Sequence, residues 1–355
     1  MKKQCVGVDI SKDSFSATLC TRTLNDHIQY STGKKFENNK QGFNQLVRWA
    51  GKEGDKEAPL AFLMEATGVY HEKLAHHLHG IGKSVYVVLP NTSKHFFSSL
   101  NIKTKTDAVD ARILALFGVE RLHQPWKPAK DIYRQMRDLS RYRIQLQEQK
   151  TALSNIAHGK EYSHGISADI TKSNKKLINI LDKEITKIKD KLEELVATDP
   201  EVAARIKKIC TLKGCAIQSV AGLVGETNGF EGFRNGKQLV SFAGMDIVQH
   251  ESGTSIKAKT RMSKKGNRFI RHLIHYPAMS ASVRVDELKA LRNRVMGKTK
   301  IPMKAQVAVQ RKLLVLIYTL WKNETEYIEG YHQKKIARAK AQATQDILES
   351  IPLEA

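Results

Sequence analysis

The sequence contains few cysteines and no long apolar run. Its 355 residues include four cysteines, which form no CxxC pair and have no histidine partner at zinc-finger spacing. A disulfide framework and a structural zinc site are therefore disfavoured, and we expect reduced thiols. The longest apolar runs, such as APLAFLM and LLVLIY, are much shorter than the roughly 20 residues of a membrane span, and the start MKKQCVGVD has no apolar signal region. We therefore expect a folded cytoplasmic protein with no membrane segment.

Acidic residues are absent from Ser252 to Val285, a stretch that we call the basic segment. The whole chain has 59 Lys and Arg residues against 36 Asp and Glu residues, which gives a net charge of +23. Such an excess favours binding to nucleic-acid backbones, because binding releases their counterions. A solvated surface normally mixes both signs of charge, so we expect the basic segment to contact nucleic acid. Its candidate contacts are Lys257, Lys259, Arg261, Lys264, Lys265, Arg268 and Arg271.

The first 90 residues alternate between strand and helix patterns. Strand patterns occur in QCVGVDIS, SFSATLC, APLAFLMEATG and SVYVVLP, whereas GFNQLVRWAGK and YHEKLAHHLHGIG have helical periodicity. This alternation predicts an α/β layer fold for residues 1–128. A further helix is expected to begin at Asp107, and HQPWKP is expected to mark the end of the domain.

Three further regions are expected after this domain. Residues 129–199 are charged and nearly all helical in pattern, and the stretch KKLINILDKEITKIKDKLEELV spaces its apolar residues by three and four, as in an amphipathic or coiled-coil helix. We predict a helical spacer or oligomerisation arm there. Residues 200–324 are predicted to form a mostly helical domain that includes the basic segment, and residues 325–355 a polar helical tail.

Four acidic residues occupy positions that packing does not explain. Asp9 and Glu65 lie at the ends of predicted buried strands, where α/β sheets place their ligand sites. Asp107 and Asp110 are three residues apart and so share one helix face. If the four converge, they repel one another unless divalent cations neutralise them. Oxygen ligands suit Mg²⁺, and two such ions can assist phosphodiester chemistry.

A simpler explanation exists for Asp107 and Asp110 alone. Acidic residues are common in the first turn of a helix because they complement the helix dipole, and Thr104 could cap this helix. The two strand-end acids favour a metal site over this explanation. In that case the acids bind metal while the neighbouring Lys103 and Lys105 bind phosphate.

Four motifs together resemble a known family. They are VGVDISKDSF, MEATGVYHEKL, NIKTKTDAVDARILA and SFAGMDIVQHESGTSIKAKTRMSKKGNRFIR, in this order along the chain. Each motif alone is weak, but the set is similar to the DEDD-type transposases of the insertion-sequence 110 family, which also includes the Piv DNA invertases. The resemblance covers about residues 4–126 and 206–285.

The resemblance implies a fold, a site and partners. The N-terminal domain would have an RNase H-like fold related to the RuvC resolvase, with the four acids as its catalytic quartet and two Mg²⁺ ions. Ser252 would be the nucleophile that becomes covalently joined to DNA. The partners would be double-stranded DNA of the element's ends and target, a structured guide RNA from the element, and further copies of the chain in a dimer or tetramer. The setting would be a bacterial or archaeal cytoplasm.

Ser252 also has a physical rationale as a nucleophile. Transfer of a DNA strand to a serine hydroxyl conserves the phosphodiester bond energy, so strands can be resealed without ATP, whereas water would leave a nick. The hydroxyl needs activation: His250 is the nearest candidate base, and the carboxylate site of the first domain is the favoured alternative, which makes the active site composite. Ser252 precedes a glycine and could instead be a turn residue, and Ser255 and Ser263 are less favoured nucleophiles.

The sequence therefore predicts an RNA-guided transposase or recombinase that cleaves and rejoins DNA with Mg²⁺. A site-specific invertase of the same family would use the same residues. A RuvC-like nuclease would use the four acids with water and would not need Ser252. A protein that only binds nucleic acid would depend on the basic segment and would not need Asp9.

Overall fold

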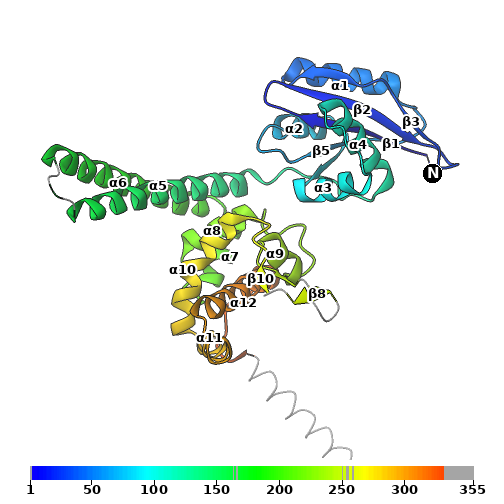
Figure 1. The fold of residues 1–355 in the computed structure, drawn as a ribbon. Helices are drawn as coiled ribbons and strands as arrows, with labels where there is room; N and C mark the ends of the chain where they lie inside the picture. The colour runs from blue at the N-terminus through cyan, green and yellow to red at the C-terminus, as the bar shows by residue number, and fades with distance from the viewer. Residues whose placement is uncertain are drawn as a thin grey trace, which may run out of the picture. The chain divides into compact units, whose positions relative to one another are not determined.

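The computed structural model describes residues 2–162, 164, 167–249, 251–252, 256–257 and 260–331. The chain divides into two compact units, Met1–Pro128 and Ala129–Ala355 (Figure 1). The N-terminal unit contains β1 (Lys3–Ile10), β2 (Ser14–Arg22), β3 (Ile28–Tyr30), β4 (Lys34–Glu37), α1 (Lys40–Glu53), β5 (Leu60–Glu65), α2 (Glu72–Gly80), β6 (Ser84–Val88), α3 (Pro90–Ser99) and α4 (Asp107–Glu120).

A six-stranded mixed sheet forms the centre of the N-terminal unit. Its strand order is β3-β2-β1-β5-β6, and β4 also pairs with β2. The strands β1, β2 and β3 pair in antiparallel fashion, whereas β5 runs parallel to β1 and β6 parallel to β5. The α/β architecture predicted from the sequence is confirmed in this unit.

Different helices cover the two faces of this sheet, and the side chains of β1 point alternately to one face and to the other. Val6 and Val8 belong to the core under α1 and α2, together with Phe43 of α1. Cys5 belongs to the core on the other face, under α3 and α4. Asp9 has the same parity as Cys5 along the strand, so it lies on the α3–α4 face.

Helix α4 lies very close to β1 because glycines occupy the contact. A Cβ atom on Gly7 of the strand would lie 2.2 Å from the carbonyl oxygen of Ala111. A Cβ atom on Gly118 of the helix would lie 2.2 Å from Sγ of Cys5. Since the strand positions rise as the helix positions fall, α4 runs antiparallel to β1. The N-terminus of α4 is therefore held at the end of β1 that carries Asp9.

Helices dominate the C-terminal unit. Its elements are α5 (Asp131–Glu161), α6 (Ala168–Ala197), α7 (Pro200–Cys210), α8 (Ile217–Glu226), α9 (Gly236–Phe242), β7 (Ile247–Val248), β8 (Glu251–Ser252), β9 (Ile256–Lys257), β10 (Arg261–Met262), α10 (Arg268–Arg284), α11 (Asp286–Thr299) and α12 (Pro302–Asn323). Met136 of α5 and Leu192 of α6 are fully buried in the same core as Leu313 of α12. The segment expected to be a spacer thus contributes to the core of this unit.

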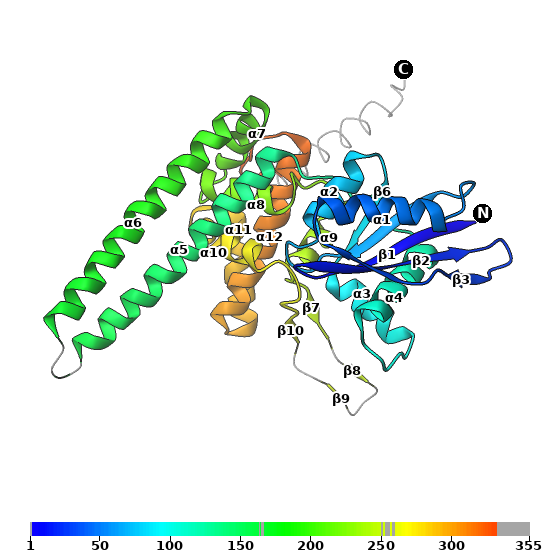
Figure 2. The same ribbon diagram turned by 90° about the horizontal axis from the view of Figure 1, so that it is seen from above.

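Helices α5 and α6 pack side by side beyond that core (Figure 2). An ion pair between Lys150 and Asp182 joins them. No helix in the described part of the chain is long and apolar enough to span a membrane. All four cysteines are free thiols, and burial raises the pKa of Cys20 and Cys215 to about 12.

The sequence patterns did not predict β3, β4, α3 or the strands β7 to β10. Strands of two to four residues are too short to show an alternating pattern. Helix α3 begins with Pro90 as its first residue, a favoured position for proline, although we expected this proline only to end the preceding strand.

Candidate active site and nucleic-acid interface

The four acidic residues predicted to bind metal, which we call the carboxylate cluster, are brought together at one edge of the N-terminal sheet. The parallel strands β1 and β5 are paired up to Val8 and Met64, so Asp9 and Glu65 are the next residues on two neighbouring strands. Such strands are about 4.8 Å apart. Asp107 and Asp110 lie in the first turn of α4, at the end of the helix that is held beside Asp9.

The three other acids influence the carboxyl group of Asp9. Its pKa is raised to about 6, first by burial and then by repulsion from Asp110, Asp107 and Glu65. Lys105 acts in the opposite direction. Four carboxylates from three elements therefore share one electrostatic environment.

The N-terminus of α4 offsets part of this repulsion. Thr106 caps the helix by accepting a hydrogen bond from the amide of Val109, at 3.3 Å, so the cap is Thr106 and not the expected Thr104. The positive end of the helix dipole favours acidic side chains in this turn. Burial nevertheless raises the pKa of Asp110, while Lys105 lowers it.

Glu65 has a partner that sequence reasoning missed. The hydroxyl of Ser93, a fully buried residue of α3, donates a hydrogen bond to Oε2 of Glu65 at 2.6 Å. This bond fixes the orientation of the carboxylate at the edge of the sheet. Pro90 could have indicated this contact, because proline is favoured in the first turn of a helix. A helix that begins at Pro90 has Ser93 as its fourth residue, one turn along.

The chemistry of the carboxylate cluster fits a hard divalent cation. It offers carboxylate oxygens, the ligands that Mg²⁺ prefers, and the pKa of Asp9 is raised first by burial and then by the three neighbouring acids. Among the described residues, no group of three or more acidic, histidine or cysteine side chains stands in ligating arrangement. The match to Mg²⁺ therefore depends on the four carboxylate groups and on the repulsion between them.

Basic side chains border the cluster. Lys103 and Lys105 are exposed in the segment before α4. Lys105 is near enough to Asp9 and Asp110 to influence both carboxyl groups. A phosphate that approached the cluster would therefore meet a cation at its rim.

Ser252 lies in the outer part of a β-hairpin in the C-terminal unit, formed by β7 to β10. Val248 pairs with Arg261 at its base, and Ser252 pairs with Ile256 farther out. Figure 2 shows these strands extending from the helices of the unit.

Three residues considered from the sequence, His250, Ser255 and Lys259, lie outside the described residues. The alternative nucleophile Ser263 is described, and its hydroxyl is buried with no hydrogen-bond partner in the described part of the chain. That burial disfavours Ser263 as the nucleophile.

The basic segment divides into exposed and structural residues. Lys257 belongs to β9. Arg261, Lys264, Lys265 and Arg268 are exposed. Arg271 instead uses Nη1 to donate hydrogen bonds to the carbonyl oxygens of Ala243, at 2.8 Å, and of Gly266, at 3.3 Å. Its part-buried guanidinium holds two loops together, which the sequence did not reveal.

The buried carboxylate of Glu226 links helix α5 to the start of helix α10, just after the hairpin. Nε and Nη2 of Arg141 in α5 donate to the two carboxylate oxygens of Glu226 in α8, at 2.6 and 2.8 Å. Asn267 donates to the same carboxylate at 2.6 Å, and its own side-chain oxygen caps α10 by accepting from the amides of Phe269 and Ile270. The loop that carries Lys264 to Arg268 therefore starts from a fixed point.

Two regions of the chain match models of known protein families. Residues 6–159 match the IS110 DEDD model, described as Transposase. Residues 206–294 match the model described as Transposase IS116/IS110/IS902 family. The first match includes the carboxylate cluster, and the second includes the hairpin with Ser252.

Similar proteins were found among curated sequences and solved structures. The pilin gene-inverting proteins of Moraxella lacunata and Moraxella bovis are 26% and 27% identical over 339 and 341 residues, and each match covers 94% of this chain and 100% of the relative. The structure of Thermus thermophilus RuvC is 11% identical, with a TM-score of 0.27, over 35% of this chain and 99% of that chain. The same protein in complex with a Holliday junction substrate gives 10% identity and a TM-score of 0.26, with the same coverage.

Proposed function

Since the chain belongs to the IS110 family of transposases and is a DNA recombinase, we propose that it cleaves and rejoins DNA strands through a covalent serine–DNA intermediate. The proposed nucleophile is Ser252. The proposed ligands of Mg²⁺ are the carboxylate cluster, Asp9, Glu65, Asp107 and Asp110. The proposed fold of the N-terminal unit is RNase H-like. The mixed sheet supports it, because β1 pairs antiparallel with β2 on one side and parallel with β5 on the other.

One observation carries this proposal. The pKa of Asp9 is raised to about 6 in part by the three other acids, although these come from β5 and α4 and are far apart in the sequence. A fold that gathers like charges in this way gains nothing in stability from it. Perturbed carboxyl groups of this kind concentrate at functional sites.

The proposed reaction is a transesterification at a DNA phosphate. The Ser252 oxygen forms a new bond to phosphorus, the bond from phosphorus to one deoxyribose oxygen breaks, and the proton lost by serine is balanced by one taken up by the leaving oxygen. A hydroxyl of another strand then attacks the phosphoserine and releases Ser252. Divalent cations, when bound to the cluster, would stabilise negative charge on the phosphate and on the exchanging oxygens. Lys105 would hold the phosphate at the rim of the cluster.

Ser252 and the carboxylate cluster belong to different units. The proposal therefore requires a hydroxyl from one unit to act at the same phosphate as the carboxylates of another, within one subunit or between two. Oligomerisation would supply the second set of residues. The pair α5–α6, which we propose packs as a coiled coil, offers a surface for it, because Ile156, Ile170, Leu177 and Ile180 are exposed there.

We propose further that a structured guide RNA directs the choice of DNA sequence. The support is the family resemblance, together with a net charge of +23, which suits binding to nucleic-acid backbones of either kind. In that case base pairing reads the sequence, and the exposed residues of the basic segment bind backbones.

Site-specific inversion is a second candidate outcome of the same chemistry. It is favoured by the two curated relatives, which are pilin gene-inverting proteins and match over 94% of this chain. Inversion and insertion differ in how the DNA sites are arranged, and the residues of the site are the same for both.

A plasmid recombination assay tests the proposed carboxylates. Asp9→Asn and Asp110→Asn are each expected to reduce strand cleavage and joining at least 100-fold in Mg²⁺, with binding to DNA retained. Asp190→Asn, which neutralises an exposed acid on α6, serves as the control. Recombination that survives in both cluster variants would rule out the proposed metal site. A plasmid that carries two inverted sites, assayed in parallel, separates inversion from insertion.

A further inference from the structure

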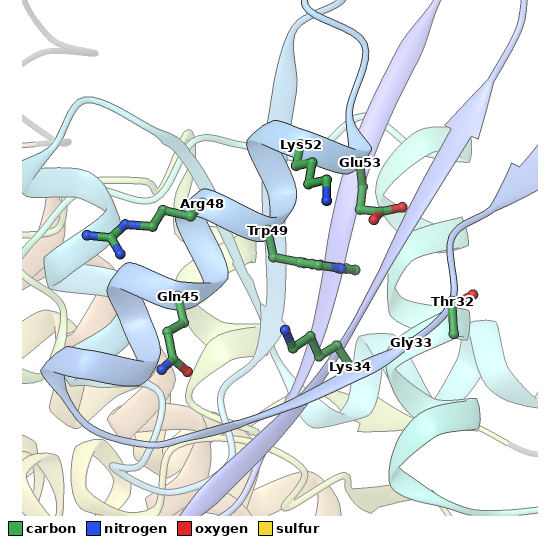
Figure 3. Close-up of a pocket in the computed structure, with 8 residues that line it drawn as sticks. All are labelled: Thr32, Gly33, Lys34, Gln45, Arg48, Trp49, Lys52 and Glu53. Carbon is green, nitrogen blue, oxygen red and sulfur yellow. The ribbon is translucent and has the colours of Figure 1, made fainter.

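A groove in the N-terminal unit lies apart from the carboxylate cluster. It has a volume of about 670 Å³ and runs between the segment Thr32–Lys34 and helix α1. Gln45, Arg48, Trp49 and Lys52 of α1 line one side (Figure 3). Positions three and four apart on a helix are neighbours, so these side chains form one continuous face.

The groove is basic. Lys34, Arg48 and Lys52 line it, and Glu53 is its one acidic residue. Each of the three cations is exposed. None of them forms an ion pair with another residue in the described ranges. Lys34 lies over the ring of Phe36, with Nζ 5.6 Å from the centroid, and its exposed charge, like those of Arg48 and Lys52, is not neutralised by a described acidic residue.

Trp49 gives the groove an aromatic wall. Its ring is partly buried against the core of the α1–α2 face and packs against Phe36, with ring centroids 5.8 Å apart. This contact fixes the indole on one side. Figure 3 shows the ring lying between Lys34 and Lys52, with one amino group on either side of it.

The groove and the carboxylate cluster use different parts of the sheet. Strand β4 pairs with β2 at the sheet edge, two strands from β1, or about 10 Å across the sheet. Trp49 and Phe36 pack on the α1–α2 face, whereas Asp9 lies on the α3–α4 face. A DNA strand bound at the carboxylate cluster would therefore leave the groove free for a second ligand.

We propose that this groove binds single-stranded nucleic acid, with an unpaired base on Trp49 and the flanking phosphates on Lys34, Arg48 and Lys52. An aromatic ring beside unpaired cations is the arrangement with which single strands are held, because every base offers a ring face to stack. In a duplex the base faces are already stacked on each other, so Trp49 would contribute nothing to its binding. The groove therefore favours unpaired segments, of RNA or of displaced DNA.

The test uses the full-length chain and two sets of substitutions. The groove set is Lys34→Gln, Arg48→Gln and Lys52→Gln together, and, separately, Trp49→Leu. The control set is Lys56→Gln, Lys73→Gln and Lys83→Gln, which removes the same charge from exposed positions of the same unit. The probes are labelled 20-nucleotide oligo(U) and oligo(dT) and a 20-base-pair DNA duplex, with affinity measured by fluorescence anisotropy over a range of salt concentrations.

The groove set is expected to weaken single-strand binding about 10-fold more than the control set, and to flatten the dependence of log Kd on log salt by about 2. Trp49→Leu is expected to weaken single-strand binding at least 5-fold and to leave duplex binding unchanged. The probe that loses more affinity, RNA or DNA, identifies the source of the bound strand. Equal effects of the groove and control sets would overturn the proposal, and so would an unchanged affinity in Trp49→Leu.

Photocrosslinking of the unsubstituted chain removes any dependence on how the variants fold. A 5-iodouracil oligonucleotide is expected to crosslink to Trp49, identified by mass spectrometry of the adducted peptide. Crosslinks to other aromatic residues alone would overturn the proposal. This outcome is distinguishable from failure of the proposed function, because covalent attachment of DNA to Ser252 does not involve the groove.

Discussion

The raised pKa of Asp9 means that its ionised carboxylate lowers the stability of the folded protein. In an unfolded chain its carboxyl has an ordinary pKa near 4, whereas in the folded protein the value is about 6. Between about pH 4 and pH 6 the folded protein therefore binds more protons than the unfolded chain. The stability that this group contributes is complete below about pH 4 and is lost as the pH rises through about 6.

Replacement of Asp9 with Asn is therefore expected to stabilise the protein in the absence of divalent cations. The expected gain in the free energy of unfolding at pH 7.5 is only about 1 kcal/mol. It is small because solvent screens the charge of a carboxylate that is only partly buried. The gain should vanish below about pH 4. Urea unfolding in EDTA at several pH values measures it, with the exposed Asp13→Asn as a control. A variant that is less stable than the parent at pH 7.5 would show that the repulsion is not present.

Individual site residues could be predicted from the sequence where a general rule links the position of a residue to a ligand site. The acids at the ends of β1 and β5 follow from the rule that α/β sheets place ligands beyond their strand ends. Ser93 could not be found in this way, because its importance depends on a hydrogen bond to a residue 28 positions away. The same holds for Arg271, which looked like a phosphate contact and instead bonds to backbone carbonyls.

At the scale of elements, the packing of α4 on β1 decides where two of the four acids lie. The helix can approach so closely only because residue 7 has no side chain. Gly7→Ala is expected to lower the free energy of unfolding by about 1–3 kcal/mol, since the new methyl group overlaps the backbone of α4. It should also reduce recombination, because displacement of α4 moves Asp107 and Asp110 away from Asp9.

Gly51→Ala provides the matched control for this prediction. Gly51 lies on the exposed side of α1, and a Cβ atom there would meet nothing within 4 Å. This substitution is expected to stabilise the protein by about 0.5–1 kcal/mol, because alanine favours helix more than glycine does. Thermal unfolding and the plasmid assay measure both variants. Equal activity and stability in Gly7→Ala and the parent would contradict the packing described for α4.

The link between α5 and the start of α10, just after the hairpin, depends in a similar way on Glu226. Glu226→Ala removes a carboxylate that accepts hydrogen bonds from both Arg141 and Asn267, and is expected to destabilise the protein by about 2 kcal/mol, because charge-assisted hydrogen bonds to a buried carboxylate are lost. Glu201→Ala, which breaks an exposed ion pair with Arg205, should cost less than about 1 kcal/mol. Urea unfolding compares the two variants, and equal effects would mean that the bonds of the Glu226 carboxylate stabilise the protein no more than the Glu201–Arg205 pair does.

Long elements with regular periodicity were predictable, and short ones were not. The strand and helix patterns of residues 4–90 and the helices α5 and α6 have clear periods in the sequence. The four strands of the hairpin have two residues each, too few for apolar and polar residues to show a period. Backbone pairing and the anchor at Asn267 specify them, and neither leaves an apolar pattern.

At the scale of the whole molecule, charge dominates the expected encounter with nucleic acid. Lys264→Gln combined with Arg268→Gln is expected to weaken duplex DNA binding equally for all sequences, and to reduce the slope of log Kd against log salt by about 2. Lys175→Gln with Lys189→Gln, exposed on α6, is the charge-matched control. Loss of affinity for one sequence alone would show that these side chains read bases and not phosphates.

The most direct test of the whole account is the detection of a covalent adduct. The protein is incubated with Mg²⁺, labelled DNA of the element's end and the adjacent non-coding RNA, and then denatured and separated by electrophoresis. A labelled protein–DNA band is expected with the parent chain and is expected to be absent with Ser252→Ala and with Asp110→Asn. Cleaved DNA without an adduct, at an unchanged level in Ser252→Ala, would contradict this expectation and would show that the carboxylate cluster acts with water as a nuclease.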